Sequence, residues 1–156
     1  MEEIRTYRPG EVIFRQGDPG DCMYDIQFGK VGIYYNYGKP DEKLLSELFP
    51  DQLFGEMGLL EHAPRSATAV SLADQTALAV VTEEGFYEFF EKNPPKVLML
   101  MQQMTERLRR TTKDYLEACS TVCESVSAEM GGKPKSKSLL SKIRRFSEFY
   151  RGNVLM

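Results

Sequence analysis

FGEMGLLEHAPRSAT, residues 54–68, is the most informative stretch of this 156-residue chain. Its two glycines, Gly55 and Gly58, allow the backbone to come close to a ligand. The short run from Glu56 to Leu60 can form one helical turn, and the free N–H groups at the start of a helix favour an anion. Arg65 directly follows Pro64 in this stretch. From there its planar guanidinium can make a two-pronged contact with a phosphate.

An acidic residue in the same stretch suits a second kind of chemical group. At neutral pH the carboxylate of Glu56 only accepts hydrogen bonds, so it calls for hydroxyl donors such as those of a sugar. A site that combines a phosphate-binding arginine with a hydroxyl-binding carboxylate predicts a nucleotide ligand.

This stretch resembles the phosphate-binding cassette of cyclic nucleotide-binding domains. The family pattern begins with F-G-E, followed by an apolar residue, a small residue and Leu. After a short variable stretch it ends with P-R, then one residue that is Ser, Thr or Ala, and then A-T. Every element of the pattern is present here. Residues 7–21, YRPGEVIFRQGDPGD, resemble the family's opening strand and turn, and residues 23–31 contain the motifs of its next hairpin. The family often has a glycine where this chain has Pro-Asp-Gln at 50–52. The resemblance extends from about Tyr7 to about Val122.

The resemblance implies specific roles for the cassette residues. Arg65 would pair with the cyclic phosphate, assisted by the backbone N–H groups of Met57 and Ser66. Gly55 and Glu56 would hold the ribose 2′-hydroxyl. The expected ligand is cyclic AMP or cyclic GMP, with no other cofactor.

A second resemblance concerns the base. Residues 102–112, QQMTERLRRTT, look like the long dimer helix of the bacterial catabolite activator family, in which paired hydroxyl residues from both subunits contact the adenine. Thr111 and Thr112 match that place, although Thr111 has an equally simple interpretation as a weak residue of a helix-pairing seam. Apolar residues near Leu45 would line one side of the pocket for the base. Because a hydroxyl residue after the arginine, here Ser66, can accept from guanine in this family, cyclic GMP remains the alternative to cyclic AMP.

The remaining pattern predicts a mainly β fold with helices at the end. Short runs between Val12 and Val81, separated by Gly, Asp and Pro turns, indicate an antiparallel barrel or jelly roll. A short helix is expected to begin at Thr82, with Thr82 as its cap. A long helix is expected from Lys96 to about Met130, roughly 50 Å at about 1.5 Å per residue.

The long helix carries apolar or small residues at alternating spacings of four and three: Val97, Met101, Met104, Leu108, Thr111, Tyr115, Ala118 and Val122. This heptad seam predicts a homodimer through residues 96–130, the alternative being a helix that packs only on its own domain.

Charge divides the chain into an acidic body and a basic end. The net charge is −3, but from Gly132 onward seven Lys/Arg and one Glu give +6, so the preceding residues carry −9. We expect residues 1–130 to form the domain and residues 131–156 a linker with a short basic amphipathic tail. The tail is expected to dock on the acidic body or on an unknown effector protein.

Several function classes are disfavoured. Cys22, Cys119, Cys123 and the single histidine, His62, have no metal-site spacing, so we expect no metal. No membrane span or export signal is visible, which predicts a cytoplasmic protein. Only about 25 residues follow Gly131-Gly132, too few for a helix-turn-helix domain, so DNA binding is not expected. No nucleophile–base pair accompanies the cassette, so we expect no catalysis. The rival hypothesis is an interaction protein that keeps the fold but binds no cyclic nucleotide, or binds another small ligand.

Overall fold

The structure is a computed structural model that describes residues 3–129. The chain divides into two compact units, Met1–Leu100 and Met101–Met156. The first unit contains all the strands and the short helices, and the second contains most of the long helix. The expected linker and tail at 131–156 lie outside the described residues, so the boundary near residue 130 and the role of the tail stay predictions.

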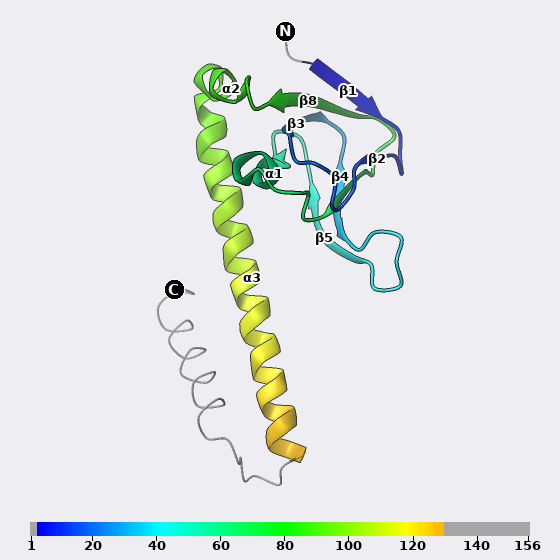
Figure 1. Ribbon diagram of the computed structural model, residues 1–156, viewed down its shortest axis with the longest axis vertical. Helices are drawn as coiled ribbons and strands as arrows, with labels where there is room; N and C mark the ends of the chain where they lie inside the picture. Colours follow the sequence, from blue (N-terminus) through cyan, green and yellow to red (C-terminus); the bar gives the residue numbers. More distant parts are fainter. Residues whose placement is uncertain (1–2, 130–156) are drawn as a thin grey trace. The chain divides into compact units, whose positions relative to one another are not determined.

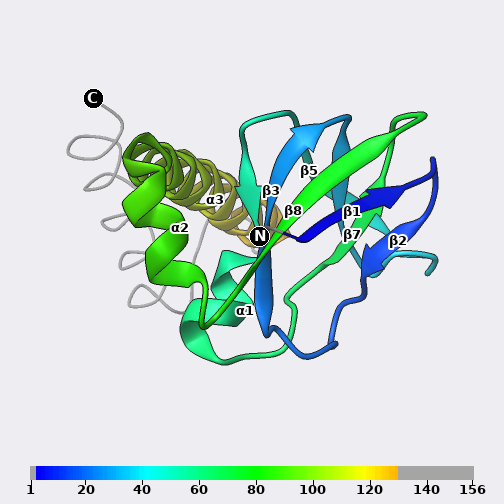
Figure 2. The ribbon, with the colours of Figure 1, turned by 90° about the horizontal axis from the view of Figure 1, so that it is seen from above.

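Two four-stranded sheets, with every strand pair antiparallel, form the first unit (Figures 1 and 2). In spatial order, the first sheet consists of β1 (Glu3–Tyr7), β8 (Thr76–Thr82), β3 (Cys22–Phe28) and β6 (Leu53–Phe54). The second consists of β2 (Val12–Phe14), β7 (Thr68–Ser71), β4 (Val31–Tyr35) and β5 (Lys43–Leu48). This arrangement confirms the predicted antiparallel β fold.

The main core contains residues from both sheets. Tyr24 and Ile26 of β3 pack in one buried cluster with Val31 of β4 and Ala69 of β7. Side chains alternate between the faces of a strand, and Met23 of β3 belongs to a second cluster with residues of the helices. Both faces of β3 are therefore covered, which explains why Cys22–Ile26 is buried without a break.

Three helices follow or interrupt the strands in the described part of the chain (Figure 1): α1 (Glu56–Glu61), α2 (Phe86–Lys92) and α3 (Pro94–Glu129). The second core cluster joins them to the first sheet, because Leu59 of α1, Phe89 of α2 and Leu100 of α3 pack on it together. Figure 2 shows α1 beside β3.

One local expectation needs correction. The short helix begins at Phe86 instead of Thr82, since Thr82 still pairs with Cys22 at the end of the β8 ladder. Its cap position is Gly85, which makes no side-chain capping hydrogen bond. A further strand, β1, covers Glu3–Tyr7 and pairs with β8 along its full length.

The long helix was predicted from Lys96 to about Met130, and α3 runs from Pro94 to Glu129. It begins with two prolines, which the first turn of a helix tolerates because its N–H groups have no partner within the helix. All eight seam residues are exposed, including Leu108 at 69% and Met101 at 61%. Although α3 is 36 residues long, no helix in the range 3–129 combines the length and hydropathy that crossing a bilayer requires.

Candidate ligand-binding site

The cassette folds as a short helix between two residues with left-handed backbone. Gly55, at φ 81°, precedes α1, and His62, at φ 48°, follows it. The N–H of Ala63 returns to the carbonyl of Gly58 at 3.1 Å, which closes the C-terminal turn. The positive φ explains the glycine at position 55, because a side chain there would be strained.

The turn between β2 and β3 holds the other end of the cassette. The N–H of Gly17 donates to the carbonyl of Arg65 at 2.9 Å, and the N–H of Arg65 donates to the carbonyl of Asp18 at 2.8 Å. The N–H of Gln16 donates to Oγ1 of Thr68 at 3.0 Å. The two motifs recognised in the sequence, at 7–21 and 54–68, therefore bond directly to each other around Arg65.

The side chain of Arg65 is buried, with 5% of its surface exposed. Its Nη1 donates to the carbonyl of Gly55 at 2.8 Å, and its Nη2 donates to the carbonyl of Cys22 at 2.7 Å. Its Nε is buried, and no acceptor in the described part of the chain bonds to it. A guanidinium has five N–H donors, so two backbone carbonyls leave hydrogen-bonding capacity for an anion.

The aromatic surroundings of Arg65 add no competing negative charge. Its Cζ lies 4.3 Å from the ring centroid of Phe14 and 6.0 Å from that of Tyr24. Burial, followed by a hydrogen bond with the Cys22 side chain, raises the pKa of the Tyr24 phenol. Tyr24 therefore stays neutral at physiological pH, and the positive charge of Arg65 is available to a ligand.

Two glycines from different motifs bring the cassette against the β2–β3 turn. A Cβ on Gly20 would lie 2.5 Å from the carbonyl oxygen of Ala63 and 2.6 Å from Cα of Gly58. A Cβ on Gly58 would lie 2.9 Å from Cα of Gly20. The backbones touch at this point, so neither position accommodates a side chain without movement.

Gly20→Ala is therefore expected to destabilise the domain by about 1–3 kcal/mol, the usual cost of overpacking. The matched control is Gly85→Ala, because Gly85 has φ −84° and its Cβ would meet no atom closer than 3.6 Å. Urea unfolding of both variants gives the comparison. Equal midpoints for Gly20→Ala and Gly85→Ala would show that the close approach does not constrain the cassette.

The other predicted cassette residues lie around Arg65 with different exposures. Glu56 is buried, at 1% exposed, and interacts with another group of the protein. Met57, 38% exposed, follows it in α1, and Ser66 is exposed directly after the arginine. Gly55 and Arg65 are joined by the hydrogen bond described above. The structure thus brings the predicted phosphate and ribose residues together within one short segment.

The residues predicted to contact the base are elsewhere. Leu45, 39% exposed, lies on β5 at an irregular point of the β4–β5 ladder, where Ile33 pairs with Ser46 and Tyr34 with Leu44. Thr111 and Thr112 are in α3 within the second unit, the first exposed and the second half-buried. Their contribution to a base site stays a prediction.

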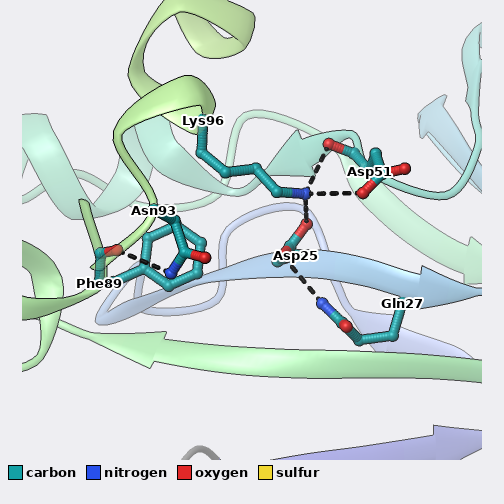
Figure 3. Close-up of polar contacts among 6 residues, drawn as sticks. All are labelled: Asp25, Gln27, Asp51, Phe89, Asn93 and Lys96. Carbon is teal, nitrogen blue, oxygen red and sulfur yellow. Dashed lines mark hydrogen bonds and ion pairs between the residues drawn. The ribbon is translucent and has the colours of Figure 1, made fainter. Parts of the chain in front are cut away.

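A polar cluster fixes the start of α3 within the first unit (Figure 3). Nζ of Lys96 lies 2.8 Å from Oδ1 of Asp25 and 3.2 Å from Oδ1 of Asp51, and it donates to the Asp51 carbonyl at 3.0 Å. Nε2 of Gln27 donates to the second oxygen of Asp25 at 2.8 Å. Asp51 has φ 71°, which accounts for the glycine that the family often has near this position, since few side chains adopt that backbone. The Pro-Asp-Gln sequence at 50–52, where the family often has a glycine, thus supplies Asp51 as a partner for Lys96.

Sequence analysis missed three contributors to the site. Phe14 and Cys22 contact the arginine from β2 and β3, and Gly20 allows the close approach. Phe14 and Gly20 lie inside the motif at 7–21, and Cys22 lies directly after it, but nothing in the local pattern distinguishes a core residue from one that touches Arg65. Among residues 3–129, no group of three or more His, Cys, Asp or Glu is arranged to hold a metal ion.

Comparison with known proteins agrees with this geometry. The family model "Cyclic nucleotide-binding domain" matches residues 4–93. The chain belongs to the cyclic nucleotide-binding domain family. It is 36% identical over 105 residues to the cyclic AMP receptor protein of Thermus thermophilus, covering 67% of this chain and 48% of that protein.

Solved structures give the same assignment. The catabolite activator protein of Thermus thermophilus superposes with a TM-score of 0.62 at 33% identity, covering 73% of this chain and 53% of the other. The EAL enzyme Bd1971 in its cAMP-bound form has a TM-score of 0.52 at 29% identity, covering 83% of this chain and 34% of the other. Its cGMP-bound form has the same TM-score at 32% identity, covering 80% and 32%. The chain spans about half the length of the curated relatives it matches.

Proposed function

We propose that this domain is a cytoplasmic receptor for a cyclic nucleotide, with cyclic AMP preferred over cyclic GMP and with no catalytic activity. Ligand binding would shift the population between two arrangements of α3 and so change what the helix or the basic tail presents to an effector protein. The names of the relatives support the ligand class, since one is a cyclic AMP receptor and another was solved with each nucleotide.

The observation that carries the proposal is that the side chain of Arg65 is buried and that its Nε has no hydrogen-bond partner among the described residues. A buried guanidinium nitrogen without a hydrogen-bond partner among the described residues costs free energy unless an acceptor reaches it. An oxygen of the cyclic phosphate is such an acceptor, and it also carries the opposite charge. The Gly55 and Cys22 carbonyls hold the guanidinium beside the start of α1, whose helix dipole adds a favourable field for an anion.

Glu56 is proposed to accept a hydrogen bond from the ribose 2′-hydroxyl. A carboxylate has about four lone-pair sites, so its interaction within the protein leaves room for a further donor. The base would be covered by Thr111 and Thr112 and walled near Leu45, with Met57 and Ser66 contributing N–H groups to the phosphate. The roles of Thr111 and Thr112 rest on the resemblance to the activator helix, and those of Met57 and Ser66 rest on the resemblance of the cassette.

A thermal shift tests the proposal as a whole. A ligand that binds only the native state at about 100 times its Kd stabilises it by about 2.7 kcal/mol. We expect cyclic AMP to raise the Tm of the full chain clearly, and cyclic GMP to raise it less at the same concentration. No shift with either nucleotide would favour the rival interaction protein.

Glu56→Gln should weaken binding of cyclic AMP more than binding of its 2′-deoxy analogue. The reason is that the Glu56 carboxylate and the ribose 2′-hydroxyl are proposed to bond to each other. Once one of them is removed, removing the other should have little further effect on the binding free energy, so the two changes should be strongly non-additive. Titration of wild type and variant with both ligands completes the double-mutant cycle. Full additivity would remove Glu56 from the ribose site.

The exposed seam of α3 supports a homodimer as part of the same proposal. Six large apolar seam residues are exposed, and a heptad repeat of this length is typical of paired helices: Val97, Met101, Met104, Leu108, Tyr115 and Val122. Leu108→Glu places a charge in the middle of the seam and should give a monomer in sedimentation velocity. Gln102→Glu adds the same charge at an exposed position off the seam and should leave the dimer intact. A monomeric wild type at high concentration would rule out this assembly.

A further inference from the structure

The guanidinium of Arg65 lies on the face of an aromatic ring from another strand. Phe14, the last residue of β2, places its ring centroid 4.3 Å from Cζ of Arg65. The ring is itself part of an aromatic group, with centroids 5.9 Å from both Tyr24 and Phe54. The position of the Phe14 ring is therefore fixed by the core and not by the arginine.

The Phe14 ring restricts a movement of the Arg65 guanidinium that its hydrogen bonds leave nearly free, namely tilting out of its own plane. All N–H donors of a guanidinium lie in its plane, so the bonds to Gly55 and Cys22 fix its edges. They resist tilting out of the plane only weakly. A ring in contact with one face opposes that tilt, and the attraction between a cation and the ring quadrupole is strongest where water is excluded, as around this 5% exposed side chain.

We propose that Phe14 is a positioning residue for phosphate recognition, holding Arg65 by cation–π stacking at the orientation in which its remaining donors meet the ligand. The inference rests on the proposed function, because it assigns a role within the same site. Phe14 does not touch the ligand; it acts through the arginine. Shape alone is not sufficient at this position, since an aliphatic residue of similar size would fill the space without attracting the cation.

Ring electronics can be varied without changing the packing. Phenylalanines with progressively more ring fluorines, incorporated at position 14, weaken the quadrupole while keeping nearly the same shape. We expect the Kd for cyclic AMP to rise stepwise with fluorination and to rise about 5- to 30-fold in Phe14→Leu, which corresponds to about 1–2 kcal/mol.

Phe54 provides the matched control. It stacks on Tyr24 at 5.2 Å within the same cluster and is 2% exposed. The same fluorinated series at position 54 should leave the Kd unchanged, because no cation lies on that ring in the described contacts. A flat Kd across the Phe14 series, or equal trends at both positions, would overturn the proposal.

A measurement without ligand separates this proposal from the proposed function. In the ligand-free 156-residue chain, the Nε–H proton of Arg65 should show a ring-current shift and slow exchange by NMR, and both should be lost in Phe14→Leu but kept in Phe54→Leu. If the wild type binds no cyclic nucleotide while these signals behave as expected, the proposed function fails and the stacking stands. If it binds and the signals are insensitive to Phe14, the positioning role fails alone.

Discussion

Arg65→Ala is expected to weaken cyclic AMP binding by about 2–5 kcal/mol, from about 30-fold to several thousand-fold in Kd. The substitution removes the buried charge that would meet the phosphate, together with all of its donors. Calorimetric titration of the variant against the wild type measures the loss. Arg8→Ala is the control, since Arg8 is exposed and the change in net charge is identical.

The same substitution is expected to lower stability, which the sequence alone did not predict. An arginine that only faced a ligand would lie outside the core, and the fold would survive its removal. The structure buries it at 5% exposure on two backbone carbonyls, and leaving buried acceptors unpaired costs about 1–3 kcal/mol. Circular dichroism must therefore confirm that the variant is folded at the titration temperature. A folded Arg65→Ala domain with wild-type affinity would refute the site.

Asp25→Ala is expected to destabilise the domain by about 3–5 kcal/mol, the range for removing one partner of a buried ion pair. The Asp25 side chain is 5% exposed and that of Lys96 is 14% exposed, so the remaining ammonium would lose its best-shielded partner (Figure 3). Urea unfolding of the full chain gives the change in free energy. Asp51→Asn is the matched control, because the Asp51 side chain is 78% exposed and an exposed pair contributes only about 0–1 kcal/mol.

A double substitution distinguishes the pair from its individual charges. Asp25→Leu combined with Lys96→Met replaces the pair by apolar groups, which is often neutral or even stabilising. We expect the double variant to be at least as stable as wild type and far more stable than Asp25→Ala. A double variant as unstable as the single one would mean that Asp25 acts through other contacts, such as the bond from Gln27.

The cassette and the long helix could be predicted because their signals are local. Gly55, Glu56 and Arg65 lie within one short segment, and the structure places them around a single helical turn. The heptad spacing likewise predicted α3 to within two residues at its start. Short apolar runs bounded by glycine and other turn residues were sufficient to predict an antiparallel β fold, because the signal for each strand lies in its own residues.

The errors and omissions share a physical cause, which is pairing between distant segments. Thr82 has the composition of a helix cap, yet its ladder partner Cys22 keeps it in β8. Strand β1 is defined by its pairing with β8, and the paired residues range from Tyr7 with Thr76 to Glu3 with Val80. Lys96 and Asp25 are separated by 71 residues, and neither has a local feature that indicates a buried pair. Such contacts become visible only when the sheets are assembled.

Isothermal titration calorimetry of the full chain with cyclic AMP tests the central claim most directly. We expect saturable binding of one nucleotide per chain, a weaker isotherm with cyclic GMP, and a difference between the two that shrinks in Thr112→Ala. In a folded Arg65→Ala variant the Kd for cyclic AMP should rise by at least about 30-fold. A wild-type chain that gives no saturable heat with either nucleotide at several temperatures, or that binds cyclic AMP equally well without Arg65, would contradict it.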